Sequence, residues 1–527
     1  MSNRMIDQCL SVRDGHLFIE GCDTTELVKE YGSPLFVVSE NQLIRNVRNF
    51  KNAFSKYWPD GEVQILPAIK SNLTLATRYV LSEEGAGADV YSEGELYAAL
   101  RGGVKPDMIS VNGGGKSAKM IKRCIEEGVL ITIEDIEEPD LINEIAKSLG
   151  KTAKVRFRVK PSFPNLWKMT DFGHEFASID LGIQIYKSGI PAEYLENLGK
   201  RVIAMSNVKL TGLHFHGGRH HASLWYWEEM MKEYGRLIAK LTKAWGNYKL
   251  ETIDIGGGYA VRRDPHSKLD IKKEVLKSAM LRPTELLLKL FGDGFRYKIL
   301  SGIFEKGVVH EASTKKAPSI EDYAKAAAGT LRKELMRHGI PLKGVKLQVE
   351  PGRSLYGNIG IHLSKVKKIK HQTTPLKLSW ALLDTTQFFL NGGVMENNFH
   401  HYEVANKVNL PKDQVADVVG QSCYGDRILP FAKVPLLEEG DIFALLDTGA
   451  YQEVSASNFN ALPRPGTIMV KDDSSEWIKL PEKIDDVFRR DRVPQRFVRV
   501  NKDEPGVIEE TEENQTNEGG KINENRS

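Results

Sequence analysis

The chain has 527 residues, of which 41% are hydrophobic and 27% charged, and its formal net charge is +3. This composition excludes a fibrous chain and is typical of a globular protein with ample apolar material for a core. Because so small a net charge provides no broad basic surface, nucleic acid is not an expected partner, and a small molecule is. The length allows about two or three domains.

The cysteines and the first residues predict a reducing, cytoplasmic environment. Cys9, Cys22, Cys124 and Cys423 are far apart, form no C-x-x-C pair and are too few to staple a chain of this size. The opening MSNRMIDQCLSVRDG has no apolar signal-peptide core, and no run approaches the roughly 18 apolar residues of a spanning helix. We therefore expect no membrane association.

Apolar, β-branched runs alternate with helical patterns between about residues 35 and 353. In chain order the runs are FVVS at 36–39, VQILPAIK, MISVNG, LITIED, VRFRVKP, VKLTGLHFHGG, LETIDIGGG and VKLQVEPG. Strands that alternate with helices indicate βαβ units, and about eight such units close a barrel. We predict an α/β fold with a TIM-like (β/α)8 barrel over residues 35–355, with the active site at the carboxyl ends of its strands.

Four other segments flank or interrupt this barrel. The irregular stretch at about 262–318 is interpreted as an insertion, after which Ser319 caps the next helix through the backbone N–H of Asp322. Short strands and turns over 356–500 predict a C-terminal all-β domain. The strand-like segment 1–34 is expected to pack with that domain. Residues 501–527, rich in Glu, Asn and Gly, are expected to form a disordered acidic tail.

Three motifs together predict the cofactor. Lys70, at the end of ILPAIK, is either a solvated strand end or a buried amine with a lowered pKa that suits imine chemistry. The three glycines of DIGGGY form either a tight turn or a cradle in which backbone N–H groups approach a phosphate. Glu350 either pairs with Arg353 or holds a proton on a heterocycle. An imine anchor, a phosphate cradle and a partner for a pyridine nitrogen are what pyridoxal 5′-phosphate requires.

With these motifs the chain resembles the fold-type III pyridoxal-phosphate decarboxylases, the group of diaminopimelate, ornithine and arginine decarboxylases. The matching segments run in order from about residue 15 to 470: PAIKSN, GADVYSEGEL, GLHFHGG, DIGGGY, EPGRSL, CYGD, GAYQ and FNALPRP. Their wording is most similar to diaminopimelate decarboxylase. The resemblance implies an alanine racemase-like barrel with a β domain, assembled as a homodimer with active sites at the interface. It also implies a carboxy-lyase that acts on an amino acid through an external aldimine and a quinonoid carbanion.

The resemblance further implies roles for individual residues. Lys70 would form the imine, His216 would stack on the cofactor, and Glu350 would pair with the pyridinium nitrogen. Cys423 would enter from the partner subunit and reprotonate the carbanion. The residues implied to bind the cofactor, besides Lys70, His216 and Glu350, are Asp89, Arg158, Gly257, Gly258, Arg353 and Tyr451.

The segment LHFHGGRHH could also have suggested a metal site, because strand alternation puts His214 and His216 on one face. With no carboxylate or thiolate motif beside them in the sequence, we expect no metal ion. His214 is interpreted as a packed or hydrogen-bonded neighbour, and His220 and His221 are left as loop residues.

Departures from the family's motifs leave the substrate open. The stretch LLDTTQFFLNGGVMENN lacks the arginine that diaminopimelate decarboxylases usually carry there, and Tyr424 follows the cysteine where they have a glutamate. Arg219 stands where the family has serine, and it meets the phosphate, a substrate carboxylate or only solvent. Candidate substrate contacts are therefore Arg219, Arg353, Tyr424 and Asp426. The expected substrate is meso-diaminopimelate or another diamino or carboxylated amino acid; the alternatives are an amino-acid racemase and an inactive regulatory homologue.

Overall fold

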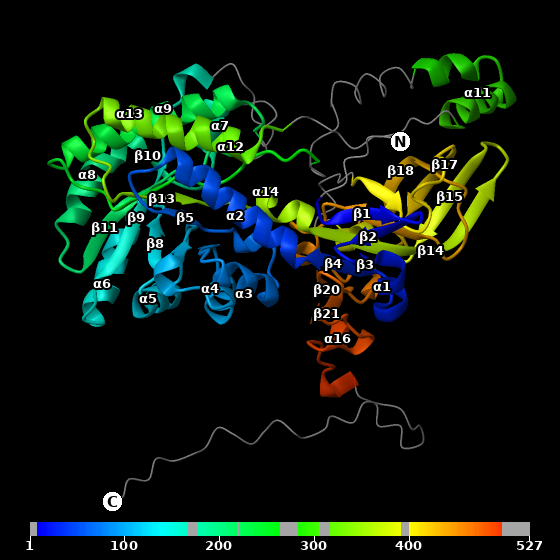
Figure 1. Ribbon diagram of the computed structural model, residues 1–527, viewed down its shortest axis with the longest axis horizontal. Helices are drawn as coiled ribbons and strands as arrows, with labels where there is room; N and C mark the ends of the chain where they lie inside the picture. The colour runs from blue at the N-terminus through cyan, green and yellow to red at the C-terminus, as the bar shows by residue number, and fades with distance from the viewer. Residues whose placement is uncertain are drawn as a thin grey trace, which may run out of the picture.

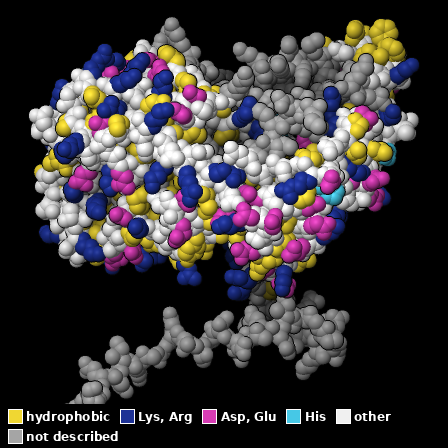
Figure 2. Space-filling view, viewed as in Figure 1, with side chains coloured by type: hydrophobic (Ala, Val, Ile, Leu, Met, Phe, Trp, Pro, Cys, Tyr) yellow, Lys and Arg dark blue, Asp and Glu magenta, His cyan; other side chains and the backbone are white. Residues whose placement is uncertain are grey.

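The structure, a computed structural model, describes residues 8–166, 178–218, 221–263, 283–305, 317–390 and 400–497. A barrel with its covering helices lies on the left of Figure 1, and a second, sheet-rich domain lies on the right. Within the described ranges no helix is long and apolar enough to cross a membrane. On the face drawn in Figure 2, basic and acidic side chains are interspersed, without one large basic surface.

Eight parallel strands form the barrel. They are β5 (Val63–Ile65), β6 (Ala88–Val90), β7 (Ile109–Val111), β8 (Leu130–Ile133), β9 (Ala153–Lys160), β11 (Val208–His214), β12 (Thr252–Asp254) and β13 (Lys346–Val349). Neighbours pair in the order β6-β7-β8-β9-β11-β12-β13-β5. The ring closes between β5 and β6, because the Gly87 N–H donates to the Ile65 carbonyl at 2.8 Å and a parallel bridge joins Ala68 to Asp89. The predicted barrel fold is confirmed.

Amphipathic helices cover the barrel. The longer ones are α2 (Glu40–Tyr57), α3 (Leu75–Glu83), α4 (Glu93–Arg101), α5 (Ala118–Glu127), α6 (Glu138–Ser148), α8 (Ala192–Ile203), α9 (Leu224–Ala244) and α13 (Thr330–Arg337). In α2, Leu43, Val47, Phe50 and Phe54 recur at helical spacing and are all buried in the barrel core. The short helix α12 (Ile320–Ala324) begins at Ser319 with the expected capping hydrogen bond from the Asp322 N–H.

The second domain is built on a nine-stranded sheet. Its path is β18-β17-β15-β14-β4-β20-β21, with β19 beside β14 and β16 beside β19. The bounds are β4 (Leu35–Ser39), β14 (Gly360–Gln372), β15 (Leu378–Leu383), β16 (Tyr402–Val404), β17 (Gln414–Val419), β18 (Arg427–Val434), β19 (Ile442–Leu446), β20 (Gly466–Lys471) and β21 (Ser474–Lys479). The long strand β14 pairs antiparallel with β4, β15 and β19, and so organises the sheet.

The strand expected at 36–39 forms, but it is not a barrel strand. This strand, β4, pairs antiparallel with β14 and parallel with β20 in the second sheet. The barrel begins with β5. The strand that completes the count of eight in place of FVVS is the short β6, within GADV, which is the second barrel strand in chain order. An apolar run indicates a strand buried on both faces but does not say to which sheet it belongs, and the three residues of β6 include the polar Asp89.

The flanking segments contact the second domain. The strands β1 (Leu10–Arg13), β2 (His16–Ile19) and β3 (Cys22–Asp23) and the helix α1 (Thr24–Tyr31) share a core with β4, β14 and β20. Within the predicted insertion, α11 (Asp293–Glu305) lies near β15 in Figure 1, and the Ser301 hydroxyl accepts a hydrogen bond from the Lys377 N–H at 3.1 Å. The predicted tail, 501–527, lies outside the described residues.

Candidate active site

Most of the predicted site residues come together at the carboxyl ends of the barrel strands. Lys70 follows β5, Asp89 lies in β6, Arg158 in β9, His216 follows β11, and Glu350 follows β13. These ends open on one rim of a parallel barrel, so side chains far apart in the sequence become neighbours.

A chain of hydrogen bonds links the predicted anchor lysine to the predicted ring partner. Lys70 Nζ donates to Asp89 Oδ2 at 3.0 Å. Asn112 Nδ2 then donates to Asp89 Oδ1 at 2.7 Å and to Glu350 Oε1 at 2.9 Å. The Lys70 side chain is 54% exposed, so the amine is open to a ligand. Neither single interpretation of Lys70 from the sequence describes it fully.

The pKa of Lys70 differs from the expectation of a lowered value. Desolvation lowers it, but the negative charges of Asp89 and Glu350, with the hydrogen bond to Asp89, outweigh desolvation, and the pKa lies above its ordinary value. A strand-end lysine gains carboxylate neighbours that the sequence does not reveal.

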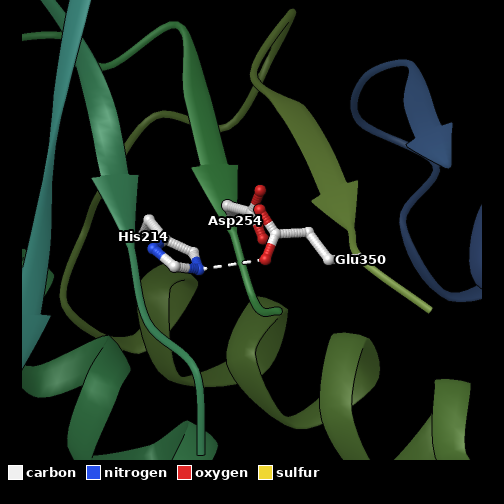
Figure 3. Close-up of side chains that lie close together, drawn as sticks. All are labelled: His214, Asp254 and Glu350. Carbon is white, nitrogen blue, oxygen red and sulfur yellow. Dashed lines mark ion pairs between the residues drawn. The ribbon is translucent and has the colours of Figure 1, made fainter. Parts of the chain in front are cut away.

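Glu350 pairs with Arg156 and His214 rather than with Arg353. Its Oε1 accepts from Arg156 Nη2 at 2.9 Å, and its Oε2 lies 3.2 Å from His214 Nε2, the contact drawn in Figure 3. Burial alone would raise the pKa of Glu350, but His214, Arg156 and Lys70 outweigh burial and hold the pKa well below its usual range. Glu350 is therefore an anion at neutral pH.

His214, Asp254 and Glu350 form a cluster whose ligand atoms lie within 4.8 Å of one another (Figure 3). The sequence has no carboxylate motif beside the histidine, but the fold brings two strand-end carboxylates to it. Burial and the charge of Glu350 raise the pKa of Asp254 to about 6. The guanidinium of Arg156 is a cation that pairs with both carboxylates, because it donates to Asp254 Oδ2 at 2.5 Å as well as to Glu350.

Sequence reasoning selected Arg158 and missed Arg156. Both lie on the same face of β9, and alternation along VRFRV could have indicated two arginines pointing into the barrel. Arg156 is fully buried, whereas Arg158 Nη1 reaches Glu134 Oε1 at 3.3 Å. The amide of Asn112, which joins Asp89 to Glu350, was missed as well.

The glycine turn after β12 is required by close packing. Gly256 and Gly258 have φ values of +66° and +101°, in the left-handed region. A Cβ at Gly257 would lie 2.1 Å from the Glu350 carbonyl oxygen, and one at Gly256 would lie 2.7 Å from His216 Nδ1. The turn thus sets the ends of β11, β12 and β13 against one another.

His216 is a neutral ring in this setting. Its Nδ1 accepts a hydrogen bond from the Gly257 N–H at 3.2 Å. Desolvation, with the positive charges of Arg158 and Lys70, lowers the pKa of His216 to about 3. An uncharged flat ring at the rim suits stacking on an aromatic ligand.

A second group of polar side chains gathers around Gly352. A Cβ there would lie 2.7 Å from the Ser71 hydroxyl and 2.8 Å from the Tyr451 hydroxyl, so glycine leaves room for both. The Tyr451 N–H donates to the Ser71 carbonyl at 2.8 Å, and the Arg353 guanidinium lies 4.9 Å from the centre of the Tyr451 ring. Two hydroxyls and a buried arginine provide donors for an anionic group such as a phosphate.

Comparison with known proteins agrees with this geometry. Residues 40–281 match the family model described as "Pyridoxal-dependent decarboxylase, pyridoxal binding domain". Diaminopimelate decarboxylase of Archaeoglobus fulgidus is 28% identical over 486 residues, 92% of this chain and 99% of that protein. The enzyme of the same name from Aquifex aeolicus is 27% identical over 478 residues, 90% of this chain and 96% of that protein. The solved structure of diaminopimelate decarboxylase from Methanocaldococcus jannaschii in co-complex with L-lysine has a TM-score of 0.76 and 26% identity, and covers 92% of this chain and 98% of its own.

The chain is similar to the fold-type III pyridoxal-dependent decarboxylases, by a family model over residues 40–281 and by relatives at 27 to 28% identity over at least 90% of the chain. The cofactor of this family is pyridoxal 5′-phosphate, and the rim supplies groups that fit each part of it. Lys70 offers the amine, Glu350 an ionised partner for the ring nitrogen, and His216 a neutral ring. The Ser71 and Tyr451 hydroxyls, which Gly352 allows to approach closely, are donors that suit the phosphate.

Of the second-domain residues named from the sequence, Tyr451 lies at the rim beside Ser71, whereas the contacts of Cys423 and Tyr424 are elsewhere. Cys423 is exposed, and its N–H donates to Asn460 Oδ1 at 2.9 Å. The ring of Tyr424 lies 5.8 Å from that of Phe388, in α15 (Gln387–Leu390). The contacts of both residues are thus with their own domain.

Asp426 organises the loop that carries Cys423. It is buried and accepts hydrogen bonds from the Thr386 hydroxyl and from the Gln387 and Ser422 N–H groups at 2.7 to 3.0 Å. These contacts indicate a structural role, and the expectation of a substrate contact at Asp426 finds no support in them. Arg219 lies outside the described residues, as does most of the stretch that lacks the family's arginine.

Proposed function

We propose that this protein is a pyridoxal 5′-phosphate-dependent carboxy-lyase that decarboxylates an amino acid, with meso-diaminopimelate as the first candidate substrate. The observation that carries the proposal is the hydrogen-bonded chain from Lys70 through Asp89 and Asn112 to Glu350. It holds an open amine and an ionised carboxylate at fixed places on one barrel rim.

Different residues of the rim bind the cofactor and hold the proton on its ring nitrogen. When bound, pyridoxal 5′-phosphate supplies an electron sink for the electrons left behind by a departing carboxylate. Lys70 provides the amine that attaches the cofactor. Glu350, held as an anion, keeps a proton on the ring nitrogen, and the neutral ring of His216 offers a stacking surface. Arg353, Tyr451, Gly257 and Gly258 are proposed to hold the phosphate, with Asp89 and Arg158 near the lysine end.

An ionised Glu350 favours decarboxylation over racemisation. A carboxylate that keeps the ring nitrogen protonated strengthens the electron sink, and a strong sink is what loss of CO2 requires. The racemases related to this family usually place arginine at the ring nitrogen instead. Here Arg156 contacts the carboxylate of Glu350, and Glu350 remains the residue proposed to pair with the ring nitrogen of the cofactor.

The substrate is proposed from the relatives' names and limited by this chain's own departures. Removal of one carboxylate from diaminopimelate leaves lysine, and L-lysine is the molecule in co-complex with the Methanocaldococcus jannaschii enzyme. Tyr424 and the arginine-free stretch beginning LLDTTQ cannot grip the distal end as a glutamate and an arginine do. We propose Arg219, with Arg353 and Tyr424, as the candidates that contact the substrate.

We further propose a cytoplasmic homodimer in which Cys423 of the partner subunit completes each active site. The thiol is exposed, and the contacts of its loop are with its own second domain. All four cysteines are free, which suits a reducing compartment. In this assembly the thiol places a proton on the carbon that has lost its carboxylate.

A screen of amino acids tests the proposal. Purified protein loaded with pyridoxal 5′-phosphate is incubated with L, D and meso forms of diamino and dicarboxylic amino acids, and both CO2 release and optical rotation are followed. We expect CO2 and lysine from meso-diaminopimelate. Loss of optical activity without CO2 release would establish the racemase alternative. Absence of CO2 release from every amino acid tested would overturn the proposal.

A further inference from the structure

The interior of this barrel is polar where such barrels are usually aliphatic. Branched apolar side chains generally fill the layers of a (β/α)8 barrel. Here a fully buried arginine, Arg156, occupies the interior, surrounded by side chains from four other strands and their ends: Ser110, Asn112, Thr132, Asp254, Gln348 and Glu350. A buried charge is retained only where the surrounding groups satisfy it.

Every nitrogen of the guanidinium has an acceptor. Nε donates to the Thr132 hydroxyl at 2.8 Å, and Nη1 donates to Asp254 at 2.5 Å and to Gln348 Oε1 at 2.7 Å. Nη2 donates to Glu350 Oε1 at 2.9 Å, with further acceptors at Ser110 and Asn112. The guanidinium is therefore fixed in orientation, with Nη2 directed at Glu350.

A fixed cation decides where a shared proton resides. A proton between a carboxylate and a pyridine nitrogen in a dry interior tends to form the neutral pair, a carboxylic acid and an uncharged ring, because low dielectric disfavours separated charges. A guanidinium in contact with the carboxylate stabilises its anion, so the proton stays on the ring. His214 also contacts Glu350 but can lose its charge, whereas arginine stays protonated.

We propose that Arg156 is a positioning residue for decarboxylation: its guanidinium keeps Glu350 ionised and thereby keeps the cofactor's ring nitrogen protonated. This inference rests on the proposed function. Asp254 is the second counter-ion, which holds the guanidinium in place, and its own N–H contact from Gly256 at 2.7 Å ties it to the glycine turn. The low pKa of Glu350, to which Arg156 contributes after His214, agrees with this arrangement.

The protonation state of the ring can be measured directly. The holoenzyme is reconstituted with pyridoxal 5′-phosphate labelled with ¹⁵N in the ring, and the ¹⁵N chemical shift separates pyridinium from neutral pyridine. We expect pyridinium in the wild type, a shift toward neutral pyridine in Arg156→Met, and recovery of pyridinium in Arg156→Lys. Turnover in Arg156→Met should fall about 10²-fold in kcat, as for loss of one preorganised charge contact, with a much smaller change in KM.

A matched control perturbs the same network without removing the charge. Thr132→Val deletes the acceptor of Arg156 Nε while the contacts of Nη1 and Nη2 remain, so its ring nitrogen should give the wild-type pyridinium signal. If Arg156→Met does not fold, the double variant Arg156→Met/Asp254→Asn, which leaves no unpaired charge on Asp254, is measured in its place with the same expectation.

The outcomes separate this inference from the proposed function. A wild-type protein that binds no cofactor or releases no CO2 from any amino acid defeats the proposed function. A wild-type enzyme that releases CO2 but holds a neutral ring overturns the role of Arg156. A pyridinium signal that survives in Arg156→Met, or in the double variant, overturns it equally.

Discussion

The barrel rim and the loop that carries Cys423 differ in how far a single chain completes them. On the rim, Lys70, Asp89, Asn112 and Glu350 are already joined by hydrogen bonds of 2.7 to 3.0 Å. The Cys423 loop has hydrogen bonds to the buried Asp426, yet its thiol is exposed and the hydrogen bond of its N–H is with Asn460 of its own domain. The difference agrees with the proposal that one chain preorganises the cofactor end of the site and that a partner subunit supplies the proton donor.

The largest effect is expected from Lys70→Ala, which removes the only group on the rim that we assign to covalent attachment. Without the amine the protein should lose the absorbance of the bound imine, and turnover should fall about 10⁴-fold or more, as when a nucleophile is deleted. Absorbance spectra and CO2 release check this. Normal turnover in the variant would show that the rim is not the active site.

Cys423→Ala tests the other half of the comparison. Loss of a proton donor should lower kcat by about 10²- to 10⁴-fold while the bound imine still forms. If the thiol comes from a second copy, mixing Cys423→Ala with Lys70→Ala creates one intact site in each mixed dimer. Random pairing then restores about one quarter of the wild-type activity.

Each variant alone is the control for this mixture. A mixture no more active than its parts would mean that Lys70 and Cys423 act within one chain, and the head-to-tail dimer proposal would fail.

The fold was predictable where strands alternate with helices, and less so where one strand had to be assigned to a sheet. The alternating pattern indicated the barrel correctly, yet FVVS was counted as a barrel strand and the three-residue β6 was not. Local patterns report burial and strand propensity, whereas membership of a sheet depends on pairing at long range. The strand β4 joins partners more than 300 residues away, at Gly360–Leu363.

The site was predictable from strand-end chemistry but not from contacts across the barrel. Lys70 and Glu350 were selected because each ends a strand, and His216 was selected through the family resemblance; the structure brings all three to one rim. Arg156 was missed because an inward-facing arginine in the middle of a strand becomes meaningful only when Asp254 and Glu350 arrive from two other strands. Asp426 was selected by a motif match, and its contacts are with Ser422 of its own loop and with Thr386 and Gln387, so its role as a substrate contact stays a prediction.

Gly352 lies where the rim meets the second domain, and Gly352→Ala should loosen cofactor binding. The new Cβ would press on the hydroxyls of Ser71 and Tyr451 at 2.7 and 2.8 Å. We expect a rise of about tenfold in the dissociation constant for pyridoxal 5′-phosphate, from displacement of one hydrogen-bonding group. Equilibrium titration of the apoprotein measures it.

Gly357→Ala is the matched control, because its Cβ would meet only Arg353 Cγ, at an ordinary 3.6 Å. Equal dissociation constants for the two variants would show that the hydroxyls packed against Gly352 do not contribute to phosphate binding.

An effect on stability, and not on the site, distinguishes the two regions by their buried histidines. His362 in β14 of the second domain and His216 on the rim both have a pKa lowered to about 3, and desolvation is the first cause in each. The His362 Nε2 lies 2.8 Å from the Thr385 hydroxyl, while its Nδ1 is buried without a hydrogen-bond partner. Acid therefore cannot protonate the ring without loss of its packing.

The sign of the pH dependence follows from this lowered pKa. The unfolded chain takes up a proton near pH 6.5 and the folded protein does not, so stability present at neutral pH is lost as the pH falls from 6.5 toward 3. His362→Gln should remove about 2 kcal/mol of the loss in unfolding free energy between pH 7 and 5. His371→Gln, an exposed change in the same strand, is the control. Urea unfolding at the two pH values measures both, and identical acid slopes in His362→Gln and the wild type would mean that the acid sensitivity arises in the barrel.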